Sequence, residues 1–160
     1  MTLLRAAFLA LLSLPVAAFA QGVQLGGAFA ADPSAPVEVT SDSLSVDQAT
    51  GAATFTGHVT IGQGDLRVQA GEVRVTYDEA TGGIARLLAS GGVTLATPEE
   101  AAEGQEADYD LSSGTLTVTG EVLLTQGPSA ISGDRLVVDL ESGTARMEGN
   151  VRTILQRSEP

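Results

Sequence analysis

The chain has 160 residues, 43% of them hydrophobic and only 4% aromatic, so we expect one domain with an aliphatic core. It carries 20 acidic residues against 8 arginines and has no lysine, a balance that disfavours nucleic acid as a partner. It has no cysteine, which excludes disulfides, thiolate catalysis and cysteine-ligated zinc.

The first residues, "MTLLRAAFLALLSLPVAAFA", have the pattern of a cleaved secretory signal. Arg5 precedes an apolar run that ends at Pro15, and the small-x-small site Ala-Phe-Ala at 18–20 follows. The apolar run is too short for a membrane-spanning helix. We therefore expect a signal peptide at 1–20 and an exported protein, with a second Ala-Phe-Ala at 28–30 as another candidate cleavage site.

Alternation of apolar and polar residues dominates the chain after residue 36, as in "GHVTIGQGDLRVQAGEVRVTYDEATG". A β-strand points successive side chains to opposite faces, so this pattern predicts an all-β domain at 37–155. Residues 21–36 are rich in Gly, Ala and Pro and are expected to be a flexible lead-in, and 156–160 a short tail. The one departure is "PEEAAEGQEADY", for which we expect a turn of helix or an exposed loop.

Four copies of one pattern punctuate the domain, starting at Asp47, Asp78, Asp110 and Asp139. In each, the aspartate is followed four residues later by glycine, within D-x-x-S/T-G or a close variant. The aspartate can accept hydrogen bonds from backbone amides just ahead of it, and glycine suits the positive φ that closes a hairpin loop. Calcium loops need several oxygen ligands at alternate positions, whereas each copy offers one aspartate, so hairpin turns are the favoured interpretation.

A second glycine follows ten residues after the aspartate in three copies, at Gly57, Gly120 and Gly149. Apolar residues keep the same phase on both sides of it, for example Val118 and Val122. A glycine within a strand marks a bend or a bulge. Bends at matching positions would fold a long sheet over on itself, giving a V-shaped or jelly-roll section with an apolar interior.

The sequence offers little with which to catalyse a reaction. His58 lies on the polar face of its strand, where a surface role is favoured over a catalytic or metal-binding one. The acidic residues are spread through turns, and "GQGD" at 62–65 lacks the following helix of a phosphate loop. We therefore expect no enzyme activity, no cofactor and no metal site. The apolar face itself is compatible with a packed core or with a bound apolar ligand.

The order of these features resembles the periplasmic lipopolysaccharide transport proteins of the LptA/OstA type. The resemblance is carried by "TFTGHVTIGQGDLRVQAGEVRVTYDEATG" and "TLTVTGEVLLTQGPSAISGDRLVVDLESGTARMEGNV" and covers nearly all of 37–155. Each segment has a G-x-V-x-hydrophobic stretch, a Gln-Gly turn and a strand that ends in Asp-x-x-S/T-G. The chain departs from the pattern in having no lysine and little sequence after Leu155.

The resemblance implies an antiparallel β-jellyroll, open at both ends, that shields lipid A acyl chains of lipopolysaccharide in the periplasm. It also implies head-to-tail self-association and contact with inner-membrane adaptor and outer-membrane translocon domains of similar fold. The lipid-binding residues are then those of the inward apolar face: Phe55, Val59, Ile61, Leu66, Val68, Val73, Val75, Leu87, Val93, Leu95, Leu116, Val118, Val122, Leu124, Leu136, Val138 and Met147.

Two other interpretations stay open at this point. One is a structural or adhesive β-repeat protein that polymerises through its edge strands and binds no lipid. The other is a membrane-anchored adaptor of the same pathway that keeps its N-terminal helix. In each case the terminal strands, about Val37 to Val46 and Met147 to Leu155, are expected to be sheet edges with an unpaired row of backbone groups.

Overall fold

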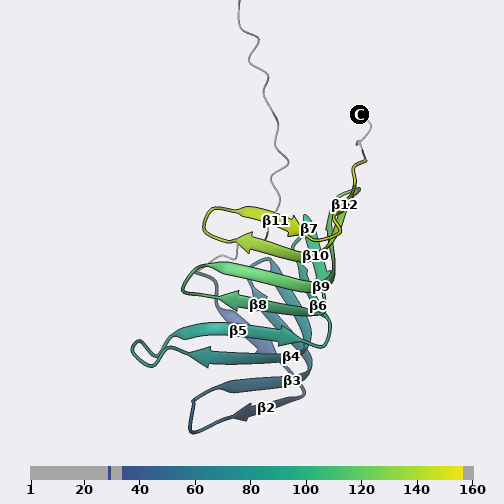
Figure 1. Cartoon of the computed structure of the whole chain (residues 1–160). Coiled ribbons are helices and arrows are strands. Elements are labelled where there is room, and N and C mark those ends of the chain that lie inside the picture. Colours follow the sequence, from purple (N-terminus) through teal and green to yellow (C-terminus); the bar gives the residue numbers. More distant parts are fainter. Residues whose placement is uncertain (1–28, 30–33, 157–160) are drawn as a thin grey trace, which may run out of the picture.

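The computed structural model describes residue 29 and residues 34–156, which form a twelve-stranded antiparallel β-sheet (Figure 1). No α-helix occurs within the described ranges. The expected signal peptide lies outside them. The strands are β1 (Val37–Thr40), β2 (Ser43–Val46), β3 (Ala53–Gln63), β4 (Leu66–Tyr77), β5 (Ile84–Ser90), β6 (Val93–Ala96), β7 (Glu100–Gly104), β8 (Glu106–Asp110), β9 (Thr115–Gln126), β10 (Ser129–Asp139), β11 (Thr144–Glu148) and β12 (Arg152–Ile154).

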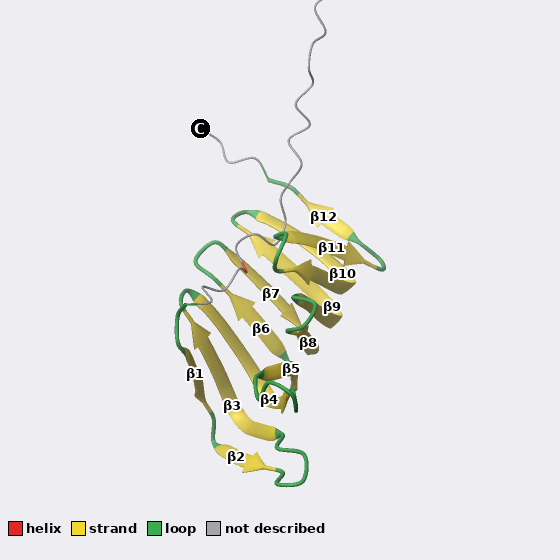
Figure 2. Ribbon diagram, turned by 90° about the vertical axis from the view of Figure 1, so that its left-hand side faces the viewer, coloured by secondary structure: helices red, strands yellow, loops and turns green. Residues whose placement is uncertain are grey.

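The sheet folds into two walls that share the long strands β3, β4, β9 and β10 (Figure 2). Wall A has the order β2-β3-β4-β5-β8-β9-β10-β11. Wall B has the order β1-β3-β4-β6-β7-β9-β10-β12. Each long strand therefore contributes one half to each wall, and the fold is the β-jellyroll of V-shaped section that the sequence predicted.

The bend between the walls lies at the mid-strand glycines, as expected. Gly120 has φ 86° and the next residue, Glu121, has φ 48°. The Gly57–His58 pair repeats this geometry, and the β3–β4 register shifts there. A Cβ on Gly120 would lie 2.6 Å from Gln105, so the corner requires glycine for space as well as for φ.

The aspartate repeats form hairpin turns, which confirms that interpretation. Oδ1 of Asp47 accepts hydrogen bonds from the backbone N–H groups of Ala49 and Thr50, at 2.8 and 3.2 Å. Asp78, Asp110 and Asp139 make the same contacts two and three residues ahead. These hydrogen bonds favour the charged carboxylate and so lower the pKa of each aspartate.

One expected element is wrong. The "PEEAAEGQEADY" stretch contains all of β7 and most of β8, which pair with β6, β9 and β5 rather than forming a helical turn or an exposed loop. Buried residues occur in both strands: Glu100 and Ala102 alternate along β7, and Ala107 of β8 is buried as well. Alanine is small and has a high helix propensity, so the apolar pattern of this stretch was weak. Pairing with distant strands stabilises the β conformation instead.

Candidate functional site

All the apolar residues nominated from the sequence lie in one cluster between the two walls. The inward orientation of that face is therefore confirmed, whereas its contact with lipid stays a prediction. The cluster is not uniform. Part of it lines a cavity of about 920 Å³, and part of it is packed solid.

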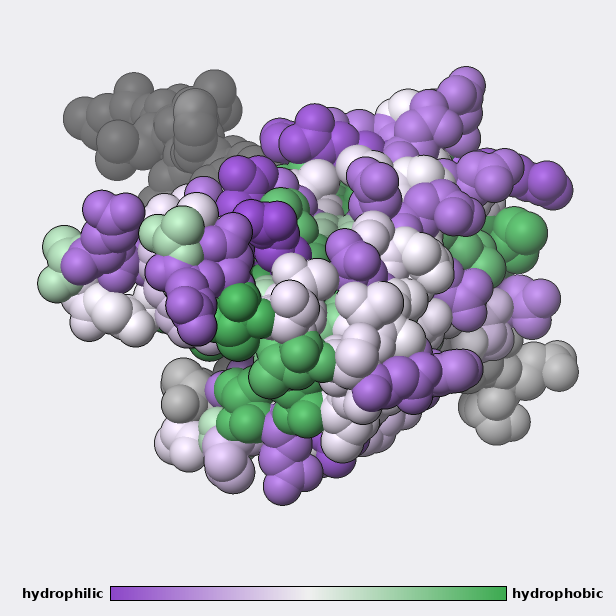
Figure 3. Space-filling view, turned by 90° about the horizontal axis from the view of Figure 1, so that it is seen from below, coloured by the Kyte–Doolittle hydropathy of each residue, from purple (hydrophilic) through white to green (hydrophobic). Residues whose placement is uncertain are grey.

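The cavity belongs mainly to the first long hairpin, β3–β4, and the strands beside it. Its size is in the range typical of ligand sites, about 300 to 1,000 Å³. Seen from the β2 end of the molecule, hydrophobic side chains gather near the middle of a hydrophilic surface (Figure 3). The nominated residues that line the cavity are Phe55, Ile61, Leu66, Val68, Val73, Val75, Leu87, Leu95 and Leu116.

The other nominated residues do not line the cavity. Most of them flank the bend or belong to the second long hairpin, β9–β10, where the interior is filled by neighbouring side chains. Val118 and Val138, for example, have no exposed surface. These residues are Val59, Val93, Val118, Val122, Leu124, Leu136, Val138 and Met147.

Polar side chains are few among the described residues that line the cavity. Gln63 and Glu141 lie on its lining, together with Tyr77 and Tyr109. Burial raises the pKa of the Tyr109 hydroxyl, so this side chain stays neutral at physiological pH. The lining among the described residues contains no arginine. The cavity therefore favours apolar chains over a charged group.

One carboxylate lies on the inner face outside the cavity lining. Glu100 of β7 is 4% exposed, and its Oε1 accepts a hydrogen bond of 2.6 Å from Nε2 of Gln126 on β9. A hydrogen-bonded amide partner lowers the cost of burying a carboxylate. Glu100 was not among the residues nominated from the sequence, because its surroundings resembled an exposed loop.

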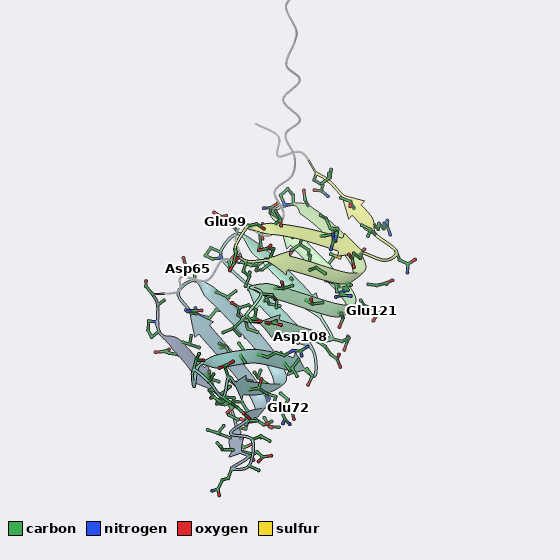
Figure 4. All side chains as sticks on the ribbon, turned by 60° about the vertical axis from the view of Figure 1, so that its left-hand side comes forward. Asp65, Glu72, Glu99, Asp108 and Glu121 are labelled. Atoms are coloured by element: carbon green, nitrogen blue, oxygen red, sulfur yellow. The ribbon has the colours of Figure 1, made fainter. Side chains whose placement is uncertain are left out.

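The remaining acidic residues are dispersed. In Figure 4, Asp65, Glu72, Glu99, Asp108 and Glu121 are spread along the sheet instead of converging on one point. Among residues 29 and 34–156, no three His, Cys, Asp or Glu side chains are grouped so as to hold a metal ion. The same residues contain no helix long and apolar enough to cross a membrane.

His58 lies outside the cavity, as its polar phase predicted. Its side chain is 92% exposed, and its Nδ1 lies 2.7 Å from Oδ2 of Asp42. The hydrogen bond and the charge of Asp42 raise the pKa of His58. No sequence pattern predicted this pair, since the partners are brought together by the bend.

Phe29 is one of the cavity-lining residues that were not nominated from the sequence; others are Val39, Ile84, Tyr109 and Leu140. It was assigned to the flexible lead-in and to a candidate cleavage site, yet its side chain is 1% exposed and lines the cavity. The one available signal was that Phe29 is the only aromatic residue between the expected signal peptide and β1. An isolated apolar residue among Gly and Ala carries no periodicity, so the pattern could not place it.

The crystal structure of LptH, the LptA homologous periplasmic component of the lipopolysaccharide transport device from Pseudomonas aeruginosa, superposes with a TM-score of 0.68. The two chains are 17% identical, and the match covers 77% of this chain and 96% of LptH. At that identity the likeness establishes the fold.

An uncharacterized protein of Rhizobium meliloti (strain 1021) is 28% identical over an alignment of 108 residues, and the match covers 63% of this chain and 55% of the relative. The chain thus spans about half the length of that relative. Residues 38–152 match the family model for the LptA/(LptD N-terminal domain) LPS transport protein. Because that match spans most of the chain, the protein belongs to the LptA/LptD N-terminal domain family of LPS transport proteins.

Proposed function

We propose that this chain is a periplasmic carrier that holds the acyl chains of lipopolysaccharide in the cavity between its walls. The observation that carries the proposal is the apolar cavity of about 920 Å³ within a domain of this family. Burial in an apolar site is worth about 0.8 kcal/mol per CH₂, so exposing a chain of a dozen carbons to water costs about 10 kcal/mol. A shielded path between membranes removes most of that barrier, and no covalent step is needed.

The test compares two neighbouring leucines on β5. Leu87 lines the cavity, whereas Leu88 is exposed on the other side of the strand. Leu87→Asp places a charge in the apolar lining and is expected to weaken lipid A binding at least tenfold in a fluorescence titration. Leu88→Asp is the matched control and should bind as the wild type does.

Folding is checked by circular dichroism and thermal unfolding, and Leu87→Trp provides a second variant that fills the cavity without adding charge. If folded wild-type protein binds no lipid A, the carrier proposal fails. Oligomers formed by such a protein would then favour the structural β-repeat interpretation.

Bridging between membranes forms the second part of the proposal. The terminal strands are edges, because β1 and β2 pair only with β3, and β11 and β12 only with β10, among the described residues. Exposed apolar side chains accompany both ends: Val37, Leu44, Val46, Val151, Ile154 and Leu155. An unpaired edge accepts a strand from another domain, so we infer that copies join head to tail and that adaptor and translocon domains of similar fold join the same way.

Arg152→Pro tests the C-terminal joint. Proline removes a backbone donor from β12, and Arg152 is exposed, so the interior should be disturbed little. Light scattering is expected to show shorter oligomers than for the wild type, while Arg152→Ala should leave their length unchanged. Oligomers of wild-type length in the proline variant would show that β12 is not a joint.

A further inference from the structure

Among the described residues, one side chain in the cavity lining does not belong to the sheet. Every other described lining residue lies in a strand or in a tight connection next to one, where the backbone ladder holds it. Phe29 precedes β1, the first strand, by eight positions, yet it is as buried as the central valines of the core. Its position depends on side-chain packing, not on strand pairing.

Phe29 lines the cavity in which an acyl chain would lie under the carrier function. It packs with the inner apolar cluster and shares the cavity lining with Val39, Phe55 and Leu66. The ring is apolar throughout, so it shields the hydrophobic lining from water as a lipid chain would.

We propose that Phe29 is a displaceable plug, an internal ligand that fills part of the cavity until an acyl chain replaces it. This inference rests on the carrier function proposed above. Burying a phenylalanine is worth about as much as burying two to four methylene groups, so a chain of a dozen carbons outcompetes it. Displacement breaks no strand pairing, because Phe29 is outside the sheet.

A plug lowers the apparent affinity for ligand by the fraction of molecules in which it is displaced. Removing the ring therefore strengthens binding, which is opposite to the effect of removing a wall residue. Phe29→Ala is expected to bind lauric acid and purified lipid A about tenfold more tightly than the wild type. Phe55→Ala is the matched control, because Phe55 lines the same cavity from β3, and its loss should weaken binding.

A second measurement follows the plug directly. The chain has no tryptophan, so Phe29→Trp introduces a single indole, whose emission can be excited selectively over that of the two tyrosines. Its emission should be blue-shifted and shielded from acrylamide without ligand. Lauric acid is expected to shift the emission to the red and to increase quenching as the ring leaves the cavity. The experiment uses the exported full chain, with its intact mass confirming that residue 29 is retained.

The outcomes separate the two proposals. Lipid binding by the wild type with equal or weaker binding by Phe29→Ala, or with an unchanged indole emission from the Phe29→Trp variant, overturns the plug and leaves the carrier function intact. Absence of binding by the wild type and by Phe29→Ala overturns both. Binding by Phe29→Ala that exceeds wild-type binding, together with the red shift, supports the plug.

Discussion

The two long hairpins, β3–β4 and β9–β10, follow one sequence pattern and yet have different interiors. Both alternate in phase, bend at a glycine and end in an aspartate turn. The first contributes most of its inner side chains to the cavity, whereas Leu116 is the one nominated residue of the second that lines it. Alternation therefore specifies which face points inward, and it does not specify how far apart the two walls lie.

The largest effect is expected at the bend of the second hairpin. Gly120→Val forces a β-branched residue to φ 86° and drives its Cβ into Gln105, so we expect a loss of about 4 kcal/mol in the free energy of unfolding. The control is Gly82→Val, at φ 70° in a turn with no atom within 4 Å of the added Cβ, with a loss of about 1 to 2 kcal/mol. Urea unfolding measures both. Equal losses would show that the packed corner adds nothing.

Truncation of one leucine from each hairpin tests the difference between them. Leu124→Ala opens a hole in a filled interior and should cost about 3 kcal/mol in unfolding free energy. Leu66→Ala enlarges a cavity that exists already and should cost about 1 kcal/mol. For ligand binding the order should reverse, because only Leu66 lines the cavity. A similar loss of stability from both variants would contradict the division into a packed and an open hairpin.

Acid should destabilise the aspartate turns, including the Asp110 turn that joins β8 to β9. The folded-state pKa of Asp110 lies below its ordinary value of 3.8, because Ser112 and Ser113 donate hydrogen bonds to it. Its contribution to stability is present above pH 3.8 and is lost as pH falls below that value through the folded-state pKa. The melting temperature should therefore fall below about pH 3.8, and less steeply in Asp110→Asn. If the melting temperature of Asp110→Asn fell equally steeply, the acid effect would come from groups other than Asp110.

The smallest effect on stability is expected from two exposed side-chain pairs at the bends next to the sheet edges. His58 pairs with Asp42 at one corner, and Asn150 donates to Asp134 at the equivalent corner with a distance of 2.9 Å. The pKa of His58 is raised above 6.5, so its contribution is present below pH 6.5 and lost as pH rises through the folded-state value.

His58 is the chain's single histidine, so an NMR titration of its ring reads this pKa directly. Asp42→Asn should lower it toward 6.5, and Asp134→Asn should not change it. Because the pair is exposed, His58→Ala should leave lipid binding and the melting temperature nearly unchanged. A large loss of binding would give His58 a role that its position does not suggest.

Local patterns were enough to predict much of this protein. Period-2 alternation identified the inner face, because strand geometry alone sends Val59 and Ile61 to one side. The aspartate turns and the bend at Gly120 were predicted because their hydrogen bonds and backbone angles involve residues close in sequence. The edge positions of the terminal strands followed from their being first and last in the repeat.

Other features depend on residues far apart in the chain. The volume left between the walls is set by the sum of many packed side chains, so sequence could not separate Leu66, which lines the cavity, from Leu124, which is packed. The burial of Phe29 and the strand state of Glu100–Gly104 likewise depend on distant partners. Faces, turns and bends could thus be derived from the order of residues, because they follow from local backbone geometry. The position of the cavity and what fills it were set by how the two walls pack in three dimensions.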